Sequence, residues 1–289
     1  MDAEKVALGD RLFHETKLSG DNSISCAHCH ILDQGGADGL AHSFGVGGVV
    51  GEMNSPTVFN AALNLAQFWD GRAQTLEDQM DGPLHAKAEM ASNWPDVVIK
   101  LQAEASYKAV FKQLYHDGIN EENIKNAIAE FERSLITVDS RFDQYLRGDD
   151  NAINDKEKKG YALFKGMGCV ACHQGENVGG NLFQTLGIME DYFATYDHIK
   201  TRDLGRFNVT GKIEDKFKFK VPSLRLVTLT APYFHDGSKA KLEDVVRTMA
   251  RYQLGIKITD ADIASVIAFL GTLVGKHPRL DVDKLAAVK

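Results

Sequence analysis

Four cysteines occur in this chain, and all of them lie in two copies of one short motif. The copies are C-A-H-C-H at residues 26–30 and C-V-A-C-H at residues 169–173. Two thiols at this spacing can each form a thioether to one edge of a porphyrin, and the histidine that follows can ligate the iron. A redox dithiol does not need that histidine, and a zinc site built from two C-x-x-C pairs would leave both histidines unexplained. The motifs therefore predict two covalent haem c groups, held by Cys26, Cys29, His30, Cys169, Cys172 and His173.

Similar sequences surround the two motifs. A G-x-x-L-F pattern precedes each one, at residues 9–13 and 160–164, and a pair of glycines follows each one. Each half ends in an amphipathic segment with helical spacing of apolar residues, after Asn120 in the first half and Thr259 in the second. Asn154, with Glu157 three residues on, is typical of a helix N-terminus. We predict a mostly α fold of two cytochrome c-like helical domains, which arose by internal duplication and hold one haem c each.

A polar, turn-prone stretch at residues 147–150 marks the junction between these units. We place the N-terminal domain at residues 1–140 and the C-terminal domain at residues 141–289. The composition, with 44% hydrophobic and 25% charged residues, is that of a globular protein. A net charge of −7 without a basic stripe argues against nucleic-acid binding, and no apolar run is long enough to predict a membrane span. Because haem c is attached outside the bacterial inner membrane, we expect a periplasmic protein, although this chain shows no signal-peptide pattern.

Several further stretches resemble the bacterial di-haem cytochrome c peroxidases, a family related to MauG. They are N-S-P-T-V-F-N at 54–60, F-W-D-G-R at 68–72, V-P-S-L-R at 221–225 and A-P-Y-F-H-D-G at 231–237. The resemblance runs from about residue 8 to about residue 273. It implies an enzyme that reduces hydrogen peroxide to water. It also implies a small electron donor, either a monohaem cytochrome c or a copper protein, and a homodimer.

The resemblance assigns different roles to the two haem groups. The haem on His30 would be the site of peroxide reduction, and the haem on His173 would accept electrons, with Met249 as its second axial ligand. Trp69 matches a tryptophan between the haems, Glu89 matches the acid–base carboxylate, and Gln79 matches a residue that orients peroxide. Without the resemblance, Met249 would be part of an apolar helix stripe, and Glu89 and Gln79 would be surface polar residues on a helix.

A calcium site is a further implication of the family pattern. Asn54, Thr230 and Pro232 match positions that hold a calcium ion between the domains, and oxygen-only ligation suits that ion. Two of the three would contribute backbone carbonyl oxygens. His235 matches a family position near the second haem.

One departure from the family concerns the first haem. Many members carry a distal histidine there, and we align it with Val46, which cannot ligate iron. His42 and His85 are weaker candidates for a replacement ligand. Our hypothesis is that the first haem is five-coordinate or water-bound even when oxidised, so that peroxide binds without prior reduction.

Two other functions are open at this stage. A di-haem electron carrier would need neither Glu89 nor an accessible iron. A MauG-type oxidase of a protein substrate would carry a tyrosine in place of Met249. The sequence favours the peroxidase over both.

Overall fold

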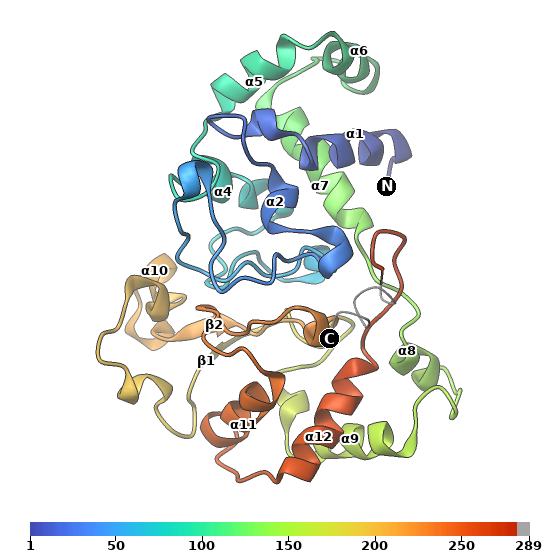
Figure 1. Ribbon diagram of the computed structural model, residues 1–289, viewed down its shortest axis with the longest axis vertical. Coiled ribbons are helices and arrows are strands. Elements are labelled where there is room, and N and C mark those ends of the chain that lie inside the picture. The colour runs from blue at the N-terminus through green and yellow to red at the C-terminus, as the bar shows by residue number, and fades with distance from the viewer. Residues whose placement is uncertain (282–289) are drawn as a thin grey trace.

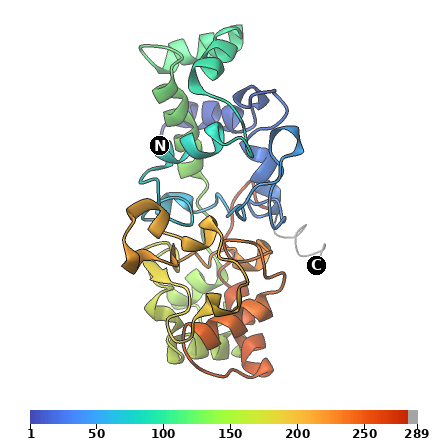
Figure 2. The same ribbon diagram turned by 90° about the vertical axis from the view of Figure 1, so that its left-hand side faces the viewer.

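The computed structural model describes residues 1–281, and helices and loops make up almost all of it (Figure 1). The upper lobe in Figure 1 holds α1 to α7, and the lower lobe holds α8 to α12 with a short two-stranded sheet. Figure 2 shows the same two lobes, one above the other, after a 90° turn about the vertical axis. The mostly α prediction is confirmed. The proposed domain boundary stays a prediction, and residues 282–289 of the predicted C-terminal domain lie outside the described residues.

The helices and strands have the following bounds. In the upper lobe they are α1 Ala3–Phe13, α2 Cys26–Cys29, α3 Leu76–Gln79, α4 Asp81–His85, α5 Trp94–Gln102, α6 Ala105–Leu114 and α7 Glu121–Ser134. In the lower lobe they are α8 Arg141–Leu146, α9 Asp155–Gly166, β1 Phe183–Thr185, α10 Phe207–Thr210, β2 Lys218–Lys220, α11 Leu242–Tyr252 and α12 Asp260–Gly271. Strands β1 and β2 pair antiparallel, with Gln184 opposite Phe219.

Helix ends form where the sequence predicts them. Asn154 caps α9 in a complete capping box, in which the Glu157 carboxylate accepts a hydrogen bond from the Asn154 backbone at 2.8 Å. Asn120 caps α7, and Thr259 caps α12 by accepting the Asp262 backbone N–H. These caps define the N-terminal ends of α7, α9 and α12.

The same helix crossing occurs in both lobes, and a glycine makes each crossing possible. A Cβ atom on Gly9 of α1 would lie 1.9 Å from the Ala127 carbonyl oxygen of α7. A Cβ atom on Gly160 of α9 would lie 1.9 Å from the Ser265 carbonyl oxygen of α12. Both helices therefore approach their partner so closely that only glycine fits. This explains why a glycine begins the repeated G-x-x-L-F pattern.

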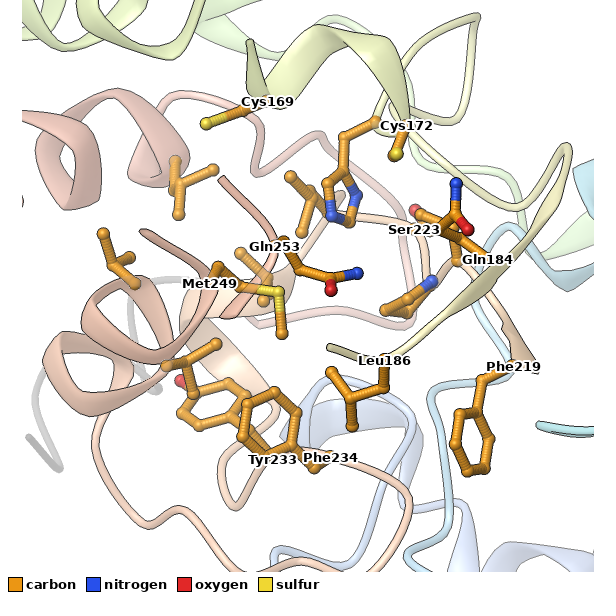
Figure 3. A pocket seen from close by; sticks show the side chains of 18 of the residues that line it. Cys169, Cys172, Gln184, Leu186, Phe219, Ser223, Tyr233, Phe234, Met249 and Gln253 are labelled. Atoms are coloured by element: carbon orange, nitrogen blue, oxygen red, sulfur yellow. The ribbon is translucent and has the colours of Figure 1, made fainter. Parts of the chain in front are cut away.

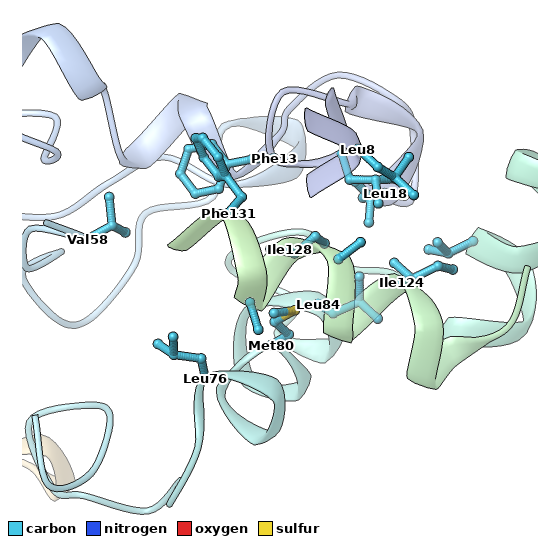
Figure 4. Packing of buried hydrophobic residues seen from close by; sticks show 14 of the residues in the cluster. Leu8, Phe13, Leu18, Val58, Leu76, Met80, Leu84, Ile124, Ile128 and Phe131 are labelled. Atoms are coloured by element: carbon cyan, nitrogen blue, oxygen red, sulfur yellow. The ribbon is translucent and has the colours of Figure 1, made fainter. Parts of the chain in front are cut away.

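The helices of each crossing pack on a separate apolar core. Figure 4 shows Leu8, Phe13 and Leu18 packed against Ile124, Ile128 and Phe131 of α7 in the upper lobe. In the lower lobe Phe142, Phe164, Val266, Phe269 and Leu273 form the corresponding core. After α12 the chain returns to the upper lobe, where Leu280 joins the first core. Within residues 1–281 every helix is too short or too polar to cross a membrane.

Candidate functional site

The second C-x-x-C-H motif opens onto a cavity of about 490 Å³ in the lower lobe. Figure 3 shows Cys169 and Cys172 at one edge of it and the Met249 sulfur pointing into it from α11. Most of its other walls are apolar, including Phe164, Leu186, Phe219, Leu224, Leu242, Val245, Val266 and Leu270. A large apolar cavity with a thiol pair on one side and a thioether on the other is suited to a flat apolar cofactor with a central metal.

The chemistry of this donor set fits haem c. His173 lies in the cavity wall, and its buried Nδ1 has no hydrogen-bond partner among the described residues. Burial lowers the pKa of His173 to about 4, so the ring is neutral at physiological pH, which is the form that ligates a metal. Burial also raises the pKa of the Cys169 thiol to about 11. All four cysteines are free thiols and none forms a disulfide, as attachment to a cofactor requires.

The first motif forms helix α2 and lies against the core of the upper lobe. Cys26 packs on that core together with Val46, and burial raises the pKa of its thiol to about 12. His30 Nδ1 lies 3.3 Å from the Gly36 carbonyl oxygen, a contact that fixes the ring when Nδ1 carries the proton. Burial lowers the pKa of His30 as well. This motif therefore also presents two protonated thiols and a neutral imidazole.

Val46 and Glu89 lie side by side near the first motif. The Val46 backbone N–H donates to the Glu89 carbonyl oxygen at 2.8 Å, and a Cβ on Gly45 would lie 2.2 Å from the Ala88 carbonyl oxygen. The loop with Val46 is thus pressed onto the turn with Glu89. The structure brings together the position of the missing distal histidine and the predicted acid–base residue.

Glu89 lies in a turn after α4 rather than on a helix surface. Its side chain is exposed to solvent, yet the protein atoms around the carboxylate desolvate it and raise its pKa, while the charge of Arg72 opposes this shift. Glu89 also acts electrostatically on Cys29. An accessible carboxyl group with a raised pKa near the haem motif can exchange protons with a bound substrate.

Gln79 is the last residue of α3 and is partly buried. Among the described residues its side chain makes no hydrogen bond with Glu89. His42 Nε2 lies 3.4 Å from an Arg202 nitrogen, and His85 is exposed at the end of α4. The structure thus gives neither histidine a contact with His30, and their ligation of the first iron stays untested.

Trp69 and the predicted calcium residues come from both lobes and line the same cavity. Trp69, Asn54, Thr230 and Pro232 all line it. Trp69 Nε1 donates to the Asn54 carbonyl oxygen at 3.0 Å, and the Asn54 backbone N–H donates to the His235 carbonyl oxygen at 2.8 Å. Asn54 Nδ2 donates to the Leu40 carbonyl oxygen, which orients the side-chain amide. The structure brings these four residues together without testing calcium binding.

Three buried polar groups near the sites escaped the sequence analysis. Asp203 Oδ1 lies 2.8 Å from His235 Nε2, and both side chains are almost fully buried. Lys220 is buried in the cavity wall. Glu132 of α7 is buried with one carboxylate oxygen unpaired, and burial raises its pKa to about 8. Their burial comes from long-range packing, and the only sequence signal was a charged residue inside an apolar stretch.

Comparison with known proteins agrees with this geometry. The family profile described as di-haem cytochrome c peroxidase matches residues 3–151. Cytochrome c peroxidase Ccp of Escherichia coli (strain K12) is 49% identical over 98% of this chain and 61% of its own length. The chain therefore spans less than two thirds of that relative. Cytochrome c551 peroxidase of Nitrosomonas europaea is 43% identical over 96% of this chain and 81% of its own.

A solved structure is similar over nearly its whole length. A MauG-like protein associated with microbial copper homeostasis superposes with a TM-score of 0.86 at 28% identity, over 97% of this chain and 93% of that one. A match over 97% of this chain extends across both lobes. The chain therefore belongs to the di-haem cytochrome c peroxidase family.

Proposed function

We propose that this chain is a periplasmic cytochrome c peroxidase that holds two haem c groups and reduces hydrogen peroxide with electrons from a small redox protein. The observation that carries the proposal is the difference between the two sites. In the lower lobe the Met249 thioether faces the haem motif across the cavity. In the upper lobe Val46, which cannot ligate a metal, lies beside Glu89. An electron carrier would have no use for an accessible iron with a carboxyl group next to it.

Each site has its own set of holding residues. Cys26, Cys29 and His30 would bind the first haem, and Cys169, Cys172, His173 and Met249 the second. When bound, these groups supply iron that takes up single electrons and, in the upper lobe, a position for peroxide. Thioether ligation favours ferrous iron, which suits the site that accepts electrons first.

Glu89 would move the protons of the reaction. One peroxide, two electrons and two protons give two waters. A proton must leave one peroxide oxygen and reach the other so that the O–O bond can break with water as the leaving group. The raised pKa of Glu89 suits a group that both accepts and returns a proton. Gln79 would orient the peroxide.

Trp69 would carry electrons between the lobes. It lines the cavity at the second haem motif, and its Nε1 donates a hydrogen bond to the Asn54 carbonyl oxygen, which fixes the indole ring. An aromatic ring at the junction shortens the distance that an electron must travel through saturated side chains. The matching crossings of α1 with α7 and α9 with α12 support an internal duplication with one haem in each domain, at residues 1–140 and 141–289.

Three parts of the proposal rest on the relatives or on the donor chemistry. The donor would be a monohaem cytochrome c or a small copper protein. Calcium would bind Asn54, Thr230 and Pro232, with carbonyl and amide oxygens as ligands. A homodimer is the family expectation.

Peroxide-dependent oxidation of reduced cytochrome c by the haem-loaded protein tests the function. Glu89→Gln should lower turnover by about 10²- to 10⁴-fold, the usual contribution of a general acid–base group, with both haem spectra unchanged. Glu52→Gln, an exposed carboxylate on the neighbouring loop, is the matched control and should keep full turnover. Undiminished turnover in Glu89→Gln, or none in the wild type, would reject the proposal.

A further inference from the structure

Lys220 is a buried cation in the wall of the cavity at the second haem motif. Only 9% of its surface is exposed, and it lines the cavity together with Trp69 and Met249. Its position on β2 is fixed, because its backbone N–H donates to the Trp69 carbonyl oxygen at 2.8 Å and Phe183 of β1 is its strand partner. Lys220 therefore enters the cavity wall next to Trp69.

Lys220 has no carboxylate partner among the described residues. The acid that acts on it electrostatically is Asp70, whose two carboxylate oxygens both accept from Arg72 Nη1 at 3.1 Å. Lys218, two residues earlier on the same strand, differs in this respect, because its Nζ pairs with Asp215 at 3.0 Å. The buried lysine is unpaired, and its more exposed neighbour is paired.

An unpaired cation in an apolar cavity is costly. The desolvation penalty for burying an isolated ammonium is large, and it is offset only by an anion with good geometry. Burial lowers the pKa of Lys220 to about 8, so the group still carries its charge at neutral pH. A ligand of this cavity that brings an anion to Lys220 would remove the penalty.

Haem supplies such an anion, since each porphyrin carries two propionate carboxylates on the edge away from the thioethers. Cys169 and Cys172 hold one edge of the cavity, and Trp69 and Lys220 line it as well. We propose that the Lys220 ammonium pairs with a propionate of the second haem and thereby raises the reduction potential of that haem. The inference rests on the proposed binding of haem c, but not on peroxidase turnover.

The physical reason for the raised potential is charge. Reduction adds an electron to the iron, and a nearby carboxylate opposes this addition. A buried ammonium paired with that carboxylate cancels its effect in a medium where charges interact strongly. Lys220 would therefore act as a positioning residue, which tunes electron acceptance next to Trp69 without touching the peroxide.

Spectroelectrochemical titration of the haem-loaded protein, without peroxide, tests this pairing. Lys220→Gln should shift the reduction equilibrium of the second haem at least tenfold toward the oxidised form, which is 59 mV for one electron. Lys220→Arg keeps the charge and should stay within threefold of the wild type. Lys218→Gln removes a charge from the same strand and should stay within twofold. A Lys220→Gln shift no larger than that of Lys218→Gln would overturn the proposal.

A second measurement needs no variant. The propionate bending band in the resonance Raman spectrum of the wild type should shift when exchangeable N–H groups are deuterated, because the ammonium donates to the carboxylate. A band that deuteration leaves in place would contradict the pairing even if Lys220→Gln does not retain haem. Neither measurement involves peroxide, so either can fail while the peroxidase proposal stands.

Discussion

The two lobes share a helix crossing and a haem motif but differ in the residues that face each motif. In the lower lobe Met249 and Leu270 line the cavity. In the upper lobe Val46 lies beside Glu89. The two crossings can be superposed residue by residue, because Ala127 and Phe131 of α7 contact Gly9 as Ser265 and Phe269 of α12 contact Gly160. In this match Glu132 of α7 takes the position of Leu270 in α12. The scaffold is repeated while the polar groups are not. This difference is what the proposed division of labour needs, with one site for receiving electrons and another for proton-coupled chemistry.

Closing the first site with a protein ligand should have the largest effect. Val46→His would place an imidazole next to Glu89, where it can ligate the first iron. If the ligand-free form falls to about 1% of the population, turnover should fall on the order of a hundredfold. Peroxide turnover and the absorption spectrum of the oxidised protein measure this. Val46→Leu should keep the wild-type rate; an equal loss in both variants would point to packing rather than ligation.

The converse change opens the second site. Met249→Leu removes the thioether, so the second haem should lose a ligand that favours ferrous iron, and electron acceptance should fall about tenfold. Potentiometry and donor oxidation rates follow the change. Val246→Leu, a change in the same cavity wall, serves as the control. Unaltered absorption in Met249→Leu would show that Met249 is a core residue only.

The crossings themselves can be tested for equivalence. Gly9→Ala and Gly160→Ala each force a Cβ against a carbonyl oxygen and should destabilise the protein by about 1–3 kcal/mol or more. Gly166→Ala, at the open end of α9, meets nothing within 4 Å and should be neutral or stabilising by roughly 0.5–1 kcal/mol. Thermal unfolding of the haem-loaded variants measures all three. Tolerance of alanine at only one crossing would refute the equivalence of the lobes.

Glu132 provides a prediction with a pH signature. Because burial raises its pKa from 4.5 to about 8, the folded protein holds a proton that the unfolded chain releases between these values. Stability should therefore decline as pH rises from about 5 to 8. Glu132→Gln removes this slope and should stabilise the protein at pH 7 by on the order of 3 kcal/mol. Melting temperatures that run parallel over this range for both proteins would rule out the shift.

Much of the fold could be predicted from sequence because its determinants are local. The C-x-x-C-H spacing, the caps at Asn120, Asn154 and Thr259 and the apolar stripes of α7 and α12 predict helices without knowledge of the tertiary structure. The stripe of α7 did not reveal the burial of Glu132, and the short strand with Lys220 was not predicted. Their burial depends on segments far away in the chain, such as Glu77 beside Glu132 and Trp69 beside Lys220.

The predicted site residues also fall into a group that local sequence reveals and a group that it does not. The haem-binding cysteines and histidines follow from spacing alone, whereas Met249, Trp69, Asn54, Thr230 and Pro232 needed the family resemblance, and the structure gathers all five around one cavity. The resemblance also pointed to Val46, and its contact with Glu89 supports that alignment. No local pattern could show that a loop at residue 46 lies on a turn at residue 89.

The most direct test of the asymmetry is electron paramagnetic resonance of the fully oxidised, haem-loaded protein at neutral pH. We predict one low-spin signal, from the haem with His173 and Met249, and one high-spin signal, from the haem with His30 and no second protein ligand. Two low-spin signals, with no high-spin component, would contradict the account, because both irons would then be closed to peroxide.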